Sequence, residues 1–67
     1  MKRSYRTGDR VKGNYQDAYP FTGTVIASAE STEGYELVRV RLDEPITLPE
    51  RGPRIFITVT PDTLTYT

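Results

Sequence analysis

The chain has 67 residues, of which 36% are hydrophobic and 27% charged, and nine Lys and Arg residues balance nine Asp and Glu residues. A chain of this length forms one domain, residues 1–67, and buries only about 60% of its unfolded surface, which leaves no room for a deep catalytic cavity. The zero net charge means that any electrostatic recognition must be local, and the absence of cysteine favours a cytoplasmic protein without disulfides. No apolar stretch approaches the roughly 18 residues of a membrane span, and residues 1–7 are expected to be a flexible basic segment.

The first half of the chain predicts two strands and no helix, because no segment carries the apolar stripe of a helix. The first strand covers residues 10–12, with Val11 pointing inward. A polar loop with aromatic residues, at positions 13–20, leads to a second strand at residues 21–29. The turn that follows, at residues 30–34, ends on Gly34, which can adopt positive φ.

The third strand, at residues 35–42, has the clearest pattern. Its apolar and charged residues alternate with the period of two that marks a half-buried strand. One face is expected to belong to the core and the other to be exposed; the first carries Val38, Val40 and Leu42, and the second Leu37, Arg39 and Arg41. The strand is expected to stop at Asp43-Glu44-Pro45, because proline cannot donate to the ladder.

A long loop with three prolines then leads to a fourth strand at residues 54–60. Pro61-Asp62-Thr63 is typical of a single turn of 3₁₀ helix, and a short last strand follows at residues 64–66. The chain is therefore expected to be all-β, with five short strands and a 3₁₀ turn before the last one.

Three motifs resemble those of the SH3-like small β-barrels that include KOW, Tudor and CAP-Gly modules. They are Gly-Asp-Arg-Val at residues 8–11, Gly-Thr-Val at residues 23–25 and Pro-Asp-Thr-Leu at residues 61–64. The resemblance implies a single five-stranded SH3-like barrel; an OB-fold is disfavoured because its helix has no counterpart here. The size and motifs favour a bacterial, phage or other mobile-element origin.

A second resemblance is to the plasmid-borne type II dihydrofolate reductases, through residues 8–11 and the Glu-Gly-Tyr turn at residues 33–35. That family forms a homotetramer with one shared active-site pore. Its catalytic Val-Gln-Ile-Tyr strand corresponds to residues 56–59, which contain neither the glutamine nor the tyrosine, and its pore lysine corresponds to Gly13. The resemblance therefore extends to architecture and not to the activity.

The residue types present give no catalytic centre. Without histidine or cysteine the chain has no Ser/His/Asp or Cys/His arrangement and no zinc ligands of those types. Asp43 and Glu44, alone or with Asp9, are a conceivable hard-cation site, but adjacent strand positions point apart and a solvated strand end explains them better. We expect no enzyme activity, no cofactor and no metal.

Surface residues carry the functional hypotheses. Tyr15 and Tyr19 are candidate ligand-contacting aromatics, and Tyr5 and Tyr66 could extend them into one patch. Arg39 and Arg41 suit nucleic-acid backbone contact, with further cations available at Lys2, Arg3, Arg6, Arg10, Lys12 and Arg54. The alternative is a solvated strand face whose arginines are neutralised by Glu30, Glu36 or Glu44.

One parity set of residues 55–59 must lie outside the barrel, and an outward Phe56 would mark a protein-binding or self-association patch. Two functions follow. The first is a non-catalytic module that binds nucleic acid or protein through Tyr15, Tyr19, Arg39, Arg41 and Phe56. The second is a homo-oligomeric barrel whose symmetric pore or groove binds a small molecule. No membrane partner is expected.

Overall fold

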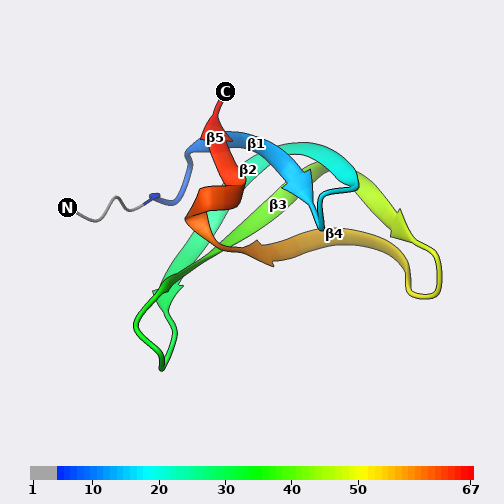
Figure 1. Cartoon of the computed structure of the whole chain (residues 1–67). Coiled ribbons are helices and arrows are strands. Elements are labelled where there is room, and N and C mark those ends of the chain that lie inside the picture. Colours follow the sequence, from blue (N-terminus) through cyan, green and yellow to red (C-terminus); the bar gives the residue numbers. More distant parts are fainter. Residues whose placement is uncertain (1–4) are drawn as a thin grey trace.

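The computed structural model describes residues 5–67 (Figure 1). Five antiparallel strands form one sheet in the order β4-β3-β2-β1-β5, so that β5 returns to lie beside β1. The elements in chain order are β1 (Arg10–Tyr15), β2 (Tyr19–Glu30), β3 (Glu36–Leu48), β4 (Gly52–Val59), the 3₁₀ turn η1 (Pro61–Thr63) and β5 (Leu64–Tyr66). The all-β class and the 3₁₀ turn before the last strand are confirmed. The sheet is open between β4 and β5 in the part of the chain that the structure describes, and closure into a barrel is not shown.

The first hairpin is longer than the sequence predicts, because the expected loop at residues 13–20 is mostly strand. β1 pairs with β2 as far as Tyr15 opposite Tyr19. Gln16 and Asp17 turn the chain with φ values of 55° and 57°, and the backbone N–H of Ala18 donates to the carbonyl of Tyr15 at 3.1 Å. Two successive positive φ angles are typical of tight hairpin turns, which usually contain Asn-Gly or Asp-Gly. Gln-Asp lacks that signature, so the sequence pattern does not predict this turn.

The expected stop of the third strand at Pro45 is wrong, since β3 continues to Leu48. The pairing of β3 with β4 shifts register between Arg41 and Ile46, and Pro45 lies within this irregular stretch. A missing N–H is tolerated where the regular ladder is interrupted. The two strands then pair again at Ile46 opposite Arg54, which turns most of the expected loop into a second long hairpin.

The core lies on one face of the sheet, here called the inner face. Val38, Val40 and Leu42 are buried, as the alternation in β3 predicts. The other buried apolar residues are Tyr5, Val11, Phe21, Val25, Ile46, Leu48, Ile57, Val59 and Leu64. Tyr5 belongs to this core, and its hydroxyl donates to the carbonyl of Leu64 at 3.2 Å. Residues 1–4, the beginning of the expected flexible basic segment, lie outside the described residues.

Gly23 lets β2 and β3 approach closely. A Cβ atom at this position would lie 2.4 Å from the carbonyl oxygen of Arg41 and 2.7 Å from a side-chain carbon of Val40. Only glycine fits at such a distance from backbone. In residues 5–67 the only helical element is η1, and no helix there is long and apolar enough to cross a membrane.

Candidate functional site

The outer face of the sheet, opposite the core, brings together three of the residues singled out from the sequence. Arg41 and Phe56 are directly opposed on β3 and β4, and Arg39 is opposed to Thr58. Directly opposed residues in an antiparallel pair share a face and lie about 5 Å apart. Arg39, Arg41 and Phe56 are therefore neighbours, and we call them the β3–β4 patch.

Phe56 is the outward residue of β4, and 44% of its surface is exposed. The guanidinium carbon of Arg39 lies 5.4 Å from the centre of the Phe56 ring. A cation over an aromatic face contributes about 0.5–1 kcal/mol at an exposed site. The arginine lies over one face of the ring, and the exposed remainder of the ring is accessible to a ligand.

The acidic residues do not neutralise this patch. Among residues 5–67, neither Arg39 nor Arg41 has a carboxylate within salt-bridge distance. Glu36 shares the parity of Val38 and is buried on the inner face, with only 8% of its surface exposed. The Ser28 hydroxyl donates to Glu36 Oε2 at 3.3 Å, whereas Oε1 has no partner among the described residues. The period of two already placed Glu36 on the core side, a signal that the sequence interpretation overlooked.

Arg10 lies on the same outer face but, unlike Arg39 and Arg41, forms an ion pair. Its two terminal nitrogens donate to Asp43 at 2.9 and 2.6 Å, and one of them also donates to the Thr24 hydroxyl at 2.8 Å. The hydrogen bonds from Arg10 lower the pKa of Asp43, and those to Asp43 raise the pKa of Arg10. Arg10 is thus committed to an internal ion pair. Of the other cations proposed for a basic stripe, Lys2 and Arg3 lie outside the described residues.

Tyr15 and Tyr19 do not join the β3–β4 patch. They form a cross-strand pair at the end of the first hairpin and pack, half-buried, against the core. Tyr15 also lines a pocket of about 460 Å³ with Leu48 and Arg54. Tyr66 lies at the opposite end of β1, where its ring centre is 4.8 Å from that of Tyr5. The five aromatic and arginine candidates are therefore split between two sites.

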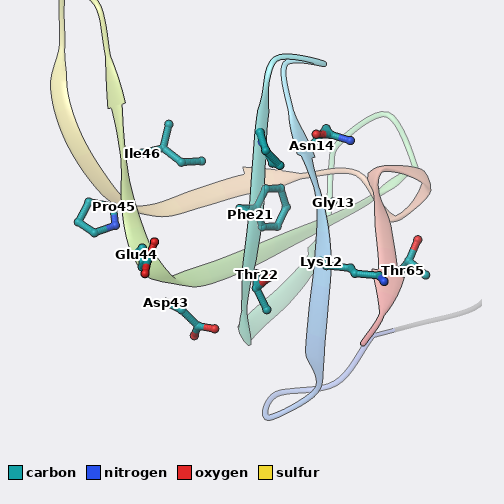
Figure 2. A pocket seen from close by; sticks show the side chains of 11 residues that line it. Lys12, Gly13, Asn14, Phe21, Thr22, Asp43, Glu44, Pro45, Ile46 and Thr65 are labelled. Carbon is teal, nitrogen blue, oxygen red and sulfur yellow. The ribbon is translucent and has the colours of Figure 1, made fainter.

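A larger pocket of about 720 Å³ opens where β2 and β3 diverge beyond the Gly23–Leu42 pair. Figure 2 shows its walls, with β1 residues on one side, β3 residues on the other and Phe21 between them. Lys12 and Glu44 place opposite charges across it. None of Tyr15, Tyr19, Arg39, Arg41 and Phe56 lines this pocket.

Over residues 5–67 no group of three or more His, Cys, Asp or Glu side chains is arranged to hold a metal ion. Asp43, part of the conceivable cation site, is instead bound to Arg10. Comparison with protein-family models, with curated proteins and with solved structures finds no match to this chain. The functional argument therefore rests on the β3–β4 patch itself.

Proposed function

We propose that this protein is a small non-catalytic binding module that holds single-stranded nucleic acid on its β3–β4 patch. The observation that carries the proposal is the exposed Phe56 ring with the Arg39 guanidinium against it and Arg41 directly opposite. Aromatic side chains beside free cations are the usual means of binding single strands, because bases stack on the ring while phosphates meet the positive charges.

Local charge supports this ligand despite the zero net charge of the chain. Strand pairing places Arg10, Thr24, Arg41 and Phe56 in one row across the outer face, and Lys12 lies on the same face next to that row. Asp43 offsets only Arg10. The outer face therefore has an excess of positive charge that suits a phosphate backbone.

A flat ring favours a nucleic acid over an acidic peptide. Stacking on an exposed ring contributes about 1–3 kcal/mol per base, whereas an acidic peptide would gain only exposed ion pairs of roughly 0–1 kcal/mol each. Single strands offer unpaired bases for such stacking, and duplexes do not.

The fold that presents the patch is, in our proposal, an SH3-like barrel. Support comes from the strand order, with β5 returning beside β1, and from the 3₁₀ turn that leads into β5. Both features agree with the three sequence motifs at residues 8–11, 23–25 and 61–64.

The test is a titration of the isotope-labelled protein with short single-stranded oligonucleotides at two salt concentrations, followed by amide chemical shifts. We expect salt-sensitive shifts at Arg39, Arg41 and Phe56, with Tyr15 and Tyr19 little affected. Phe56→Ala should weaken binding about tenfold or more, in line with the loss of one stacked base.

Arg51→Ala is the matched control for the arginine variants, because Arg51 is exposed in the turn between β3 and β4. Arg39→Ala and Arg41→Ala should each weaken binding more than Arg51→Ala does. Equal losses in all three variants, or an absence of shifts with every oligonucleotide, would rule out this function.

A further inference from the structure

Residues 55–59 of β4, at the open edge of the sheet, lack the features that keep edge strands from pairing, whereas Pro53 and Arg54 lie at the start of the strand. β4 has β3 as its only hydrogen-bonded neighbour among the described strands. From Ile55 to Val59 it carries no charged residue and no proline. Natural edge strands are usually blunted by charges, prolines or short length, because an unpaired row of N–H and C=O groups templates another strand.

Two other open parts of the sheet do show such protection. Where β2 and β3 diverge at the larger pocket, the two strands carry Pro20 and Pro45. The opposite edge of the sheet is β5, which has only three residues. Residues 55–59 of β4 therefore form an open edge without such protection in the described sheet.

Exposed apolar side chains lie on both sides of this edge. Ile55 is 46% exposed and Phe56 is 44% exposed, and successive residues of a strand point to opposite faces. A partner that docked on one face would cover only one of them. A strand added beside β4 would contact both side chains from the edge and would also pair the open backbone groups.

We infer that the partner is a second copy of this chain, joined through antiparallel pairing of the two β4 strands around a two-fold axis within residues 55–58. The strand is self-complementary, since an axis through Phe56 would place Arg54 of one copy opposite Thr58 of the other. No like charges would meet across such a junction. A two-fold contact closes on itself and pairs both β4 edges.

The dimer goes beyond the proposed nucleic-acid binding and does not depend on it. Its ten strands would form one continuous sheet, and the two copies would place their β3–β4 patches side by side on the outer face. Four arginines would then flank two Phe56 rings. The dimer would thus double the positive charge along one surface of a neutral chain.

The experiment is light scattering coupled to size-exclusion chromatography, over a series of protein concentrations. We expect a mass that rises from 7.6 kDa toward twice that value as concentration increases. Ile55→Lys should shift the protein to the monomer. Tyr35→Lys is the matched control, because Tyr35 is 47% exposed but lies outside β4, and it should dimerise like the original protein.

Thr58→Lys provides a second variant in case Ile55→Lys does not fold, since Thr58 is exposed on the outer face of β4. Thr22→Lys, on the interior strand β2, is its control. Circular dichroism establishes that each variant is folded. A mass of 7.6 kDa at the highest soluble concentration would overturn the inference.

Mixed samples of labelled and unlabelled protein test the geometry. Antiparallel self-pairing predicts intermolecular proton contacts between β4 residues of the two copies. A dimer that survives both lysine substitutions, or one whose contacts lie elsewhere, would show a different interface. Growth into large open assemblies would likewise contradict a closed two-fold dimer.

Discussion

In two regions of the same sheet, similar residues have different surroundings. Around β1, Arg10 is tied to Asp43 by two hydrogen bonds, and Tyr15 and Tyr19 pack against the core. On β3 and β4, Arg39 and Arg41 have no carboxylate partner among residues 5–67, and Phe56 is exposed. The charged and aromatic groups of the first region are engaged within the chain. In the second region the arginines lack carboxylate partners in the described part of the chain and the phenyl ring is exposed.

The comparison shows that residue type alone does not identify a binding surface. An arginine that already holds a carboxylate must break that pair before it can bind an anion, and a packed tyrosine must leave the core before it can stack on a base. Arg39, Arg41 and Phe56 face neither requirement.

The strongest predicted loss of stability distinguishes the two faces of β4. Ile57 is buried and Phe56, its neighbour, is exposed. Ile57→Ala should lower the free energy of unfolding by about 2–5 kcal/mol, because it leaves a cavity in the core. Phe56→Ala should cost about 1 kcal/mol or less. Urea denaturation at one protein concentration measures both, and similar losses would place Phe56 in the core.

The aromatic residues of the two regions should show opposite behaviour. Tyr19→Ala should destabilise the fold by about 1–2 kcal/mol, as expected for a half-buried ring, while nucleic-acid affinity stays close to that of the unmodified chain. Phe56→Ala should instead reduce affinity and spare the fold. Fluorescence anisotropy with a labelled oligonucleotide, together with thermal melts, gives both readouts. A large affinity loss in a folded Tyr19→Ala variant would move the site to the first hairpin.

The arginines should differ in the salt dependence of binding. Arg41→Ala should reduce the slope of log affinity against log salt by about 0.7, the value for one phosphate contact on a single strand. Arg10→Ala should leave the slope nearly unchanged, because Arg10 is already paired with Asp43. Binding isotherms at four salt concentrations measure these slopes. Equal slopes for Arg41→Ala and Arg10→Ala would contradict the prediction.

The smallest expected effect concerns pH. Hydrogen bonds from Arg10 hold the pKa of Asp43 below its ordinary value of 3.8. Because the pKa is lower in the folded state, the ionised carboxylate stabilises the fold above about pH 4, and this contribution disappears as the pH falls through the folded value. Asp43→Asn should therefore lower the melting temperature slightly near neutral pH, with a difference that shrinks in acid.

A double variant controls for other effects of that substitution. In an Arg10→Ala background, Asp43→Asn should change the melting temperature much less, because the ion pair is already absent. An undiminished effect there would mean that Asp43 acts through another contact. The effect is small because both side chains are exposed.

Local sequence patterns are enough to predict the all-β class, the turn at residues 61–63 and the inward set Val38, Val40 and Leu42. These features depend on local physics, since alternation fixes which side of a strand a residue occupies and proline fixes φ at the start of the turn. The same period of two also placed Arg39 and Arg41 on the opposite face from Val38 and Val40.

The contacts between distant residues depend instead on how the strands pair. The length of both hairpins depended on a Gln-Asp turn and on a register shift near Pro45, neither of which has a clear local signature. The pairing of Arg10 with Asp43 joins residues 33 positions apart, and the contact of Arg39 with Phe56 depends on the β3–β4 register. Because a charge or a ring can contact a ligand only where the fold leaves it accessible, the candidate site is apparent only in the assembled sheet.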